Sequence, residues 1–238
     1  MTGTIINVVA IVLGGAVGLL FGSKLPERLR QTIIAGLGLF SLGLGISMFV
    51  KTQNSLVVLA SLLLGTVLGE WLQIEGGLER MGIWLQQRFA RSDVPGEQAR
   101  FVHGFLTASL LFCIGPVAIL GSIQDGLIGD YNLLTVKSIM DGFASIAFAS
   151  SLGVGVLFSA LPILIYQGAI SLMAGGAQQL ITNPMIVEMS AAGGLLLMGV
   201  ALNMLEIKKV RVGNMLPALF IAPLIVALMA FLGFSLAG

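Results

Sequence analysis

The chain has 238 residues, of which 57% are hydrophobic and only 10% are charged, and its net charge is +1. Soluble domains carry about 25% charged residues, and a water-soluble fold of this length could not cover so much apolar surface with polar groups. The composition therefore excludes a soluble protein and predicts an all-α, polytopic membrane protein whose main partner is the lipid bilayer. We also expect no nucleic-acid binding, because no basic stripe with interleaved aromatic residues occurs.

Eight segments are long and apolar enough to cross the hydrocarbon core, which takes about 20 residues of helix. We expect them to form a single transmembrane domain over residues 1–238, with helices at roughly 4–22, 33–50, 55–73, 101–123, 138–160, 162–180, 186–205 and 215–236. The first segment lacks a basic region and a small-residue cleavage site, so we expect a retained span rather than a signal peptide.

The fifth and sixth segments are separated by little more than Pro162. We expect two full spans there. A re-entrant hairpin in place of two spans is the alternative, and it would leave every basic loop on the same side of the membrane because the number of crossings stays even. A single kinked helix over 138–180 would instead move the last basic loop to the other side.

The basic residues are concentrated in three polar gaps between these segments. Ten of the 12 lie there: Lys24, Arg28 and Arg30, then Arg80, Arg88, Arg91 and Arg100, then Lys208, Lys209 and Arg211. Basic residues beside membrane spans are retained on the cytoplasmic side. If the chain starts outside, all three gaps become cytoplasmic loops, and both termini face away from the cytoplasm.

The second gap, residues 74–100, contains an amphipathic pattern. Its apolar residues recur at helical spacing: Leu78, Met81, Trp84, Leu85 and Phe89. Such a helix can lie in the headgroup layer with its cations near anionic lipid. We expect a linker at the cytoplasmic membrane surface; a peripheral gate is the alternative.

Small residues recur at four-residue intervals, as in Gly14 and Gly18 or Gly65 and Gly69. They allow close approach of helices, within the chain or in a homo-oligomer.

The sequence from Pro26 can also be laid over that from Pro184. Because the second and seventh spans would run in opposite senses, a true match indicates inverted repeats of three helices. Chance similarity between apolar helices is the other explanation.

Polar residues gather where the fourth span passes into the fifth. Gly115-Pro116 interrupts the fourth span, and proline leaves backbone carbonyls without their usual partner. Discontinuous helices of this kind commonly build solute sites in transporters. The candidate residues for binding a substrate or ion are Cys113, Gly115, Pro116, Ser122, Gln124, Asp125, Asp141, Ser145 and Gln167. A packing kink beside a solvated loop is the plainer alternative.

Acidic residues should gather at the outward end of the bundle. Asp125, Asp130, Asp141 and Glu188 would form a negative mouth that concentrates cations, although loop carboxylates are often only solvated. Asp125 and Asp141 are expected to converge on a bound cation or proton, with Lys137 as the competing partner.

Enzyme signatures are absent from the sequence. It has one histidine and no HExxH, Walker A, GxSxG or cysteine cluster, so we expect no enzyme, no cofactor and no histidine-rich metal site. The leading hypothesis is a transporter or channel for a small cation or polar solute. The alternative is a membrane scaffold or sensor that binds partner helices or lipid.

Three stretches also resemble a known family. They are GTIINVVAIVLGGAVGLLFGSKLPERL, LFCIGPVAILGSIQDGLIGD and KSIMDGFASIAFASSLGVGVLFSALPILIYQG. They are similar to the YdfK/YqgA-type bacterial inner-membrane proteins, a family defined as a domain of unknown function, and the resemblance extends over nearly the whole chain. It implies a multi-pass protein of the bacterial plasma membrane, with a transport role sometimes suggested. It implies no substrate and no functional residues.

Overall fold

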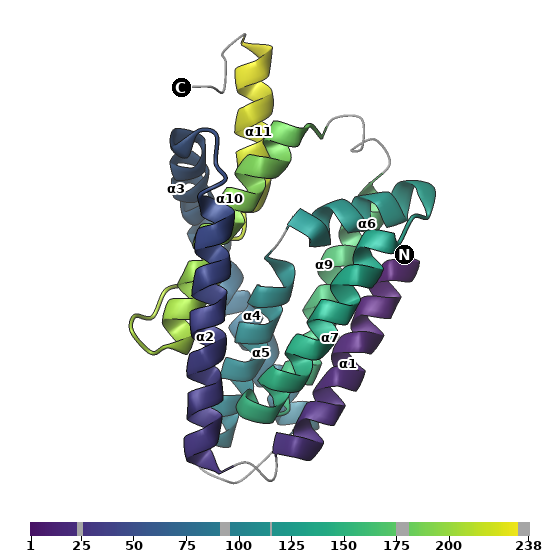
Figure 1. Ribbon diagram of the computed structural model, residues 1–238, viewed down its shortest axis with the longest axis vertical. Helices are drawn as coiled ribbons and strands as arrows, with labels where there is room; N and C mark the ends of the chain where they lie inside the picture. Colours follow the sequence, from purple (N-terminus) through teal and green to yellow (C-terminus); the bar gives the residue numbers. More distant parts are fainter. Residues whose placement is uncertain (23–25, 91–95, 115, 175–180, 233–238) are drawn as a thin grey trace. The chain divides into compact units, whose positions relative to one another are not determined.

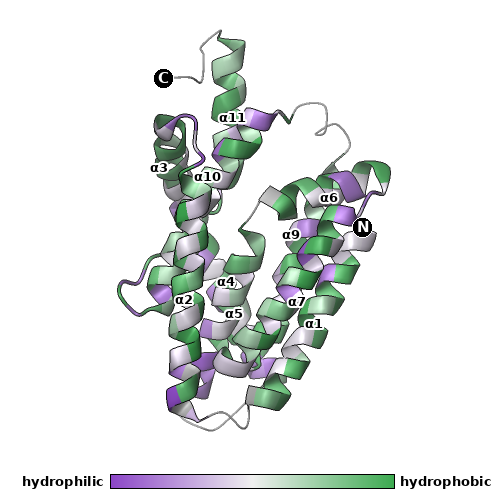
Figure 2. Ribbon diagram, in the orientation of Figure 1, coloured by the Kyte–Doolittle hydropathy of each residue, from purple (hydrophilic) through white to green (hydrophobic). Residues whose placement is uncertain are grey.

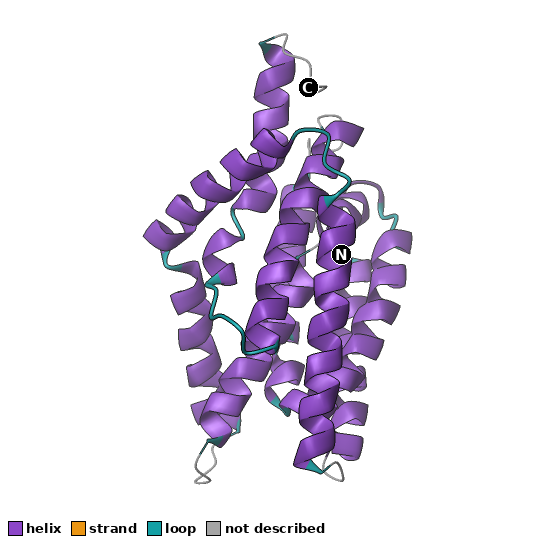
Figure 3. Ribbon diagram, turned by 60° about the vertical axis from the view of Figure 1, so that its left-hand side comes forward, coloured by secondary structure: helices purple, strands orange, loops and turns teal. Residues whose placement is uncertain are grey.

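The structure is a computed structural model that describes residues 1–22, 26–90, 96–114, 116–174 and 181–232. Within these ranges the secondary structure is helical and contains no strand (Figure 3). The helices are α1 Thr2–Gly22, α2 Glu27–Phe49, α3 Ser55–Leu72, α4 Ile74–Phe89, α5 Glu97–Cys113, α6 Pro116–Ile128, α7 Asn132–Leu152, α8 Gly155–Phe158, α9 Ala160–Met173, α10 Asn183–Met204, the 3-10 turn η1 Val212–Met215 and α11 Ala218–Phe231 (Figure 1).

Seven of the described helical segments are long and apolar enough to cross a membrane. The count rises to eight when α5 and α6, which are bent by 65° relative to one another, are taken as one broken span. Hydrophobic residues run along most of α1 and α11, and hydrophilic residues gather at several helix ends and loops (Figure 2). The predicted all-α membrane protein with about eight spans is confirmed.

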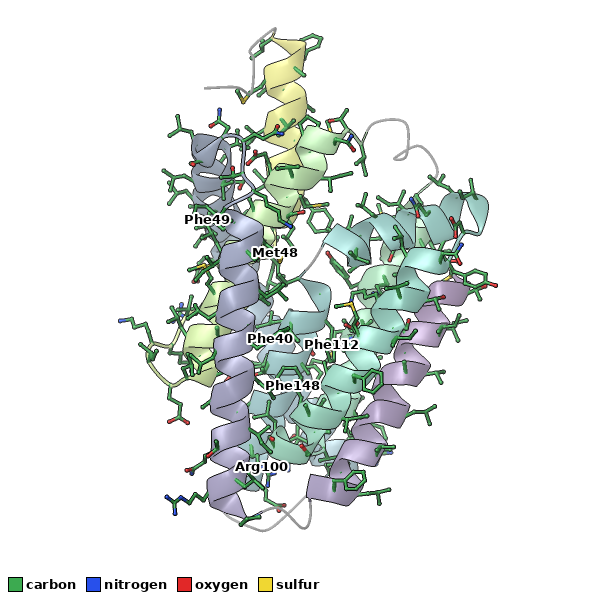
Figure 4. The ribbon with its side chains drawn as sticks, viewed as in Figure 1. Phe40, Met48, Phe49, Arg100, Phe112 and Phe148 are labelled. Atoms are coloured by element: carbon green, nitrogen blue, oxygen red, sulfur yellow. The ribbon has the colours of Figure 1, made fainter. Side chains whose placement is uncertain are left out.

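The boundary between the fifth and sixth spans differs from the prediction. The fifth span is α7, which ends at Leu152, and the next candidate span is Gly155–Met173. The turn occurs at Gly153, whose φ of 90° favours glycine, and Arg100 (labelled in Figure 4) donates a hydrogen bond to the Ser151 carbonyl there at 3.1 Å. Pro162 lies in the first turn of α9, where a missing N–H breaks no helical hydrogen bond.

The chain divides into two compact units. Unit 1 comprises residues 1–36, 78–113 and 117–178, and unit 2 comprises residues 37–77, 114–116 and 179–238. Each unit is described by itself below. The single transmembrane domain expected from the sequence stays a prediction.

In unit 1, α1 packs along α7 over much of its length (Figure 1). Gly14 lies against the Gly142 carbonyl and Gly18 against the Ile146 carbonyl, so a Cβ at either glycine would collide with backbone. Residue numbers rise together along this contact, which means that α1 and α7 are parallel. The four-residue glycine spacing therefore serves a close helix contact inside the chain.

The span that follows α7 runs the opposite way to α1 and α7. The candidate span Gly155–Met173, which contains α8 and α9, is antiparallel to α1, because Asn7 meets Gln167 of α9 while Gly15 meets Leu157 of α8. Since α7 is parallel to α1, α7 and α9 also run in opposite directions, and the single kinked helix considered for residues 138–180 is excluded.

The predicted amphipathic helix corresponds to α4, but its apolar face is divided. Leu85 is buried against Phe101 and Phe105 of α5, whereas Trp84 and Phe89 remain exposed. α4 therefore packs on α5 through part of the face that was expected to lie in the headgroup layer. Of the predicted 74–100 linker, residues 91–95 lie outside the described ranges and the last residues begin α5.

In unit 2, residues 37–49 of α2 run antiparallel to α10. Gly45 and Gly194 lie against each other's carbonyl oxygens, so neither position has room for a Cβ. Nearby, Val58 of α3, Ala192 of α10 and Ala222 of α11 form a core with no exposed surface. The helices α2 and α10, whose sequences match from Pro26 and Pro184, thus run in opposite senses as inverted repeats require. That each inverted repeat extends over three helices stays a prediction.

The close contact between Gly45 and Gly194 predicts a local effect of adding one methyl group. Gly45→Ala should destabilise the protein by about 1–3 kcal/mol, because the new Cβ meets the Gly194 carbonyl and Met198. Gly43→Ala is the matched control on the same helix, since nothing lies within 4 Å of its Cβ position. Melting temperatures of the two purified variants check this; equal shifts would show that the contact is unimportant.

Candidate functional site

A buried polar cluster lies among α1, α7 and α9 of unit 1. Asn7 Nδ2 donates to Asp141 Oδ2 at 3.1 Å and to Gln167 Oε1 at 3.3 Å. Lys137 Nζ forms an ion pair with the same Asp141 oxygen. Lys137 and Asp141 share one face of α7 because they are four residues apart, and the glycine contact brings α1 close enough for Asn7 to reach them.

Four polar atoms on the same three helices have no hydrogen-bond partner among the described residues. They are Thr4 Oγ1, Asn7 Oδ1, Ser145 Oγ and Gln167 Nε2, and all four side chains are fully buried. Thr4 precedes Asn7 by three residues and Ser145 follows Asp141 by four, so each shares a helix face with the groups above. Ser151 Oγ, near the end of α7, is also unpartnered. An unpaired buried polar group costs about 1–3 kcal/mol, which calls for an explanation.

We use the name polar cluster for Thr4, Asn7, Lys137, Asp141, Ser145 and Gln167. The orientation of its two amides follows from the carboxylate. Ionised Asp141 can only accept, so Asn7 must present its NH₂ group, and Gln167 must then present its carbonyl to Asn7. The free amide atoms are consequently one acceptor, Asn7 Oδ1, and one donor, Gln167 Nε2.

The Phe112 ring lies beside the lysine end of the polar cluster. Lys137 Nζ lies 5.9 Å from the centre of the Phe112 ring of α5, a distance at which the ring face attracts a cation. Phe112 packs edge to face on Phe148 at 6.3 Å between ring centres (Figure 4). The Lys137 and Asp141 side chains keep 10% and 11% of their surface exposed, so the ion pair is slightly more accessible than the amides.

Asp125 is buried but has partners of its own. Its carboxylate accepts from the Gly3 backbone N–H at 3.0 Å and lies 2.9 Å from the amino group of Met1. It thereby stabilises the first turn of α1, where a negative charge is favoured by the helix dipole. Asp141 is engaged by Lys137 and Asn7 instead. The expectation that Asp125 and Asp141 share one cation is corrected here, because each carboxylate is paired with different protein donors.

The other two predicted acids are also accounted for by protein groups. Glu188, in unit 2, is fully buried and accepts from Thr52 Oγ1 at 2.6 Å and from the backbone N–H groups of Gln53 and Asn54 at 2.7 and 3.1 Å. Asp130 accepts from the Asn132 N–H at 3.0 Å and closes a local turn. All four acids that were expected to form a negative entrance for cations therefore have hydrogen-bond or ion-pair partners within the protein.

The remaining predicted site residues lie around the helix break or on α6. The predicted interruption is confirmed, since α5 ends at Cys113 and α6 begins at Pro116. Cys113 is a buried free thiol, Gly115 lies outside the described residues, and the Pro116 side chain does too. The Ser122 hydroxyl donates to its own helix and its carbonyl accepts from Ser171 at 2.8 Å, while Gln124 is half-buried.

Of the predicted set, Asp141 and Gln167 both bond to Asn7, and Ser145 lies one helical turn from Asp141 on the same face of α7. Sequence reasoning named Lys137 only as a competing partner of the two acids, and it left Asn7 and Thr4 out of the candidate set. A usable signal was present, since Asn7 is an amide within a helix that contains no charged residue. Within the described ranges, no three His, Cys, Asp or Glu side chains come together as a metal site.

Comparison with known proteins places these features in a family context. The family described as "Protein of unknown function (DUF554)" matches residues 2–227. The chain is 36% identical over 220 residues to "Uncharacterized protein YqgA" of Escherichia coli, covering 92% of this chain and 94% of that protein. It is 31% identical over 230 residues to "Uncharacterized membrane protein YdfK" of Bacillus subtilis, covering 95% and 96%. No solved structure shows significant similarity to the chain.

The ion pair within the polar cluster predicts non-additive effects on stability. Asp141→Asn should lower the free energy of unfolding by about 3 kcal/mol, because it leaves the Lys137 charge buried without a partner. Adding Lys137→Gln should recover most of that loss. A double-mutant cycle on the purified protein measures this coupling, and strictly additive single effects would contradict the pairing.

Proposed function

The chain belongs to the DUF554 family, and we propose that it is a membrane transport protein that moves a small polar solute or cation through the polar cluster of unit 1. The observation that carries this proposal is the set of unpartnered polar atoms on α1, α7 and α9. All three helices contribute to segments long enough to cross a membrane. Polar groups at such positions are costly and usually functional.

Buried and half-buried polar groups elsewhere in the chain provide the comparison. Asn203 of α10 uses both ends of its amide, donating to the Val210 carbonyl at 2.8 Å and accepting from the Val210 N–H at 2.7 Å. Glu188 likewise receives three donors. These networks are closed, as expected for groups that only stabilise the fold. Asn7 and Gln167 each leave one amide atom open, which is the pattern expected of a site that receives a ligand or water.

The break between α5 and α6 supports the same proposal. Discontinuous helices expose backbone groups at membrane depth and recur in the solute sites of transporters. α5 also carries Phe112, which contacts Lys137 of the polar cluster. The helices on either side of the break, α5 and α6 from Val117 onward, therefore lie in the same unit as the open polar groups, whereas residues 114–116 belong to unit 2.

A scaffold or sensor role has one specific observation in its favour. Trp84 and Phe89 of α4 are exposed, with relative exposures of 56% and 62%, and Arg80 and Arg88 lie on the same helix. Exposed aromatic and basic residues on an amphipathic helix suit contact with lipid headgroups or a partner helix. This role concerns α4 and leaves the open polar groups unexplained, so transport remains the leading proposal.

We place the protein in the bacterial plasma (inner) membrane with both termini outside the cytoplasm. The relatives from Escherichia coli and Bacillus subtilis support a bacterial membrane. The excess of Lys and Arg in alternate loops supports the orientation. The helix directions within each unit are compatible with this threading, since α1 and α7 are parallel and α2 and α10 antiparallel.

The orientation predicts the activity of two topology reporters. A reporter fused after Gly238 should be active outside the cytoplasm, and one inserted at Ser92 should be active inside, because an odd number of spans separates these points. Paired periplasmic and cytoplasmic reporters at each position provide the internal control. Activity of both sites on the same side would contradict the eight-span orientation.

The transport proposal predicts different consequences for two buried serines of α7. Ser145→Ala should lower the transport rate about tenfold, because it removes an unpartnered hydroxyl worth one hydrogen bond to the ligand. Ser138→Ala is the matched control, since its hydroxyl already donates to the Leu134 carbonyl at 2.6 Å. Uptake of labelled glycerol, acetamide, glycine, Na⁺ and K⁺ into reconstituted vesicles measures the effect. Equal behaviour of the two variants, or no uptake of any solute by the wild type, argues against transport through this site.

A further inference from the structure

We propose that the polar cluster takes an uncharged solute that carries a hydrogen-bond donor beside an acceptor, such as a primary amide or a polyol, in preference to a bare cation. This inference rests on the proposed function and defines its substrate class. It goes beyond that proposal because the transport argument alone leaves cations and neutral solutes equally open.

The first argument is the charge of the polar cluster. Lys137 and Asp141 cancel one another, and the other four members are neutral. The three helices that carry the polar cluster add no further charge: α1 and α9 have no charged residue, and α7 has only Lys137 and Asp141. Asp125 of α6 is already paired with the first turn of α1. A monovalent cation would therefore enter as an unbalanced charge in a low-dielectric setting, which is strongly unfavourable.

The second argument is the chemistry of the open atoms. Hard cations are bound by several oxygen ligands together. The polar cluster instead presents Gln167 Nε2, an N–H donor, alongside the acceptor Asn7 Oδ1. The N–H dipole repels a cation and attracts a carbonyl or hydroxyl oxygen. A solute with a neighbouring donor and acceptor can satisfy both amide atoms.

The third argument is that the Asn7 and Gln167 amides cannot exchange their donor and acceptor ends. Asp141 accepts from Asn7, and this contact determines which amide atoms remain open. Thr4 and Ser145 add hydroxyl groups, which can rotate to donate or accept. The site therefore combines two oriented groups with two adaptable ones. Sites built to hydrogen-bond a ligand discriminate strongly against analogues that leave those groups unpaired.

Thermal unfolding of the full chain in lipid nanodiscs tests this solute class. Acetamide, glycerol, glycine, NaCl and KCl are titrated separately, with choline chloride holding the ionic strength constant. Acetamide or glycerol should raise the melting temperature along a saturable curve, as expected for a ligand that binds the folded state. Ser145→Ala should raise the half-saturating concentration about fivefold through loss of one hydrogen bond, whereas Ser138→Ala should leave it unchanged.

Three results would overturn the inference. One is a saturable response to Na⁺ or K⁺ that Asp141→Asn removes. Another is a saturable response to glycine that is lost when Lys137→Gln and Asp141→Asn are combined, which would show that the ion pair itself receives a zwitterion. The third is an acetamide and glycerol response that is linear and identical in the wild type and Ser145→Ala, as for a bulk cosolvent.

Uptake into vesicles reconstituted with the same proteins separates this inference from the proposed function. Cation binding together with cation uptake would leave transport standing and reject the neutral solute. Saturable acetamide or glycerol binding without uptake of any probe would support the solute class and reject transport.

Discussion

The hydrogen bond from Asn7 to Asp141 joins α1 to α7 and orients the polar groups around it. It links residues 134 positions apart, and it forms because Gly14 and Gly18 let α1 approach the α7 backbone. The same contact assigns the donor and acceptor ends of Asn7 and, through Asn7, of Gln167. Helix packing and the chemistry of the candidate site therefore depend on one buried interaction between an amide and a carboxylate.

The two units use buried polar residues in different ways. In unit 2, Asn214 Oδ1 accepts from the Glu75 N–H at 2.7 Å, and Glu75 Oε2 accepts from the Gly213 N–H at 2.9 Å. Together with the closed networks of Glu188 and Asn203, these contacts hold loops to helix ends. The polar cluster of unit 1 lies instead between membrane-length helices and remains incomplete. Incomplete networks are tolerated where a ligand or water completes them, and for this reason we propose the binding site in unit 1.

Local features of the chain were sufficient to predict much of the fold. Hydropathy identified the spans, because lipid demands long apolar helices, and Gly115-Pro116 marked the broken span. The turn at Gly153 was missed because Pro162 resembles a helix end, although proline is tolerated in a first turn. Asp141 was recognised as an intramembrane acid, but its partner Asn7 was not. That pairing depends on which helices become neighbours, and no local pattern in the sequence encodes it.

An experimental structure in lipid at a resolution that shows ordered water is the most direct test of the open polar cluster. Density for a small molecule or water is predicted within hydrogen-bond distance of both Asn7 Oδ1 and Gln167 Nε2. The Asn7 NH₂ group should remain on Asp141. Asn7 and Gln167 amides that instead close completely on protein groups, with no density beside them, would contradict the assignment of a binding site to unit 1.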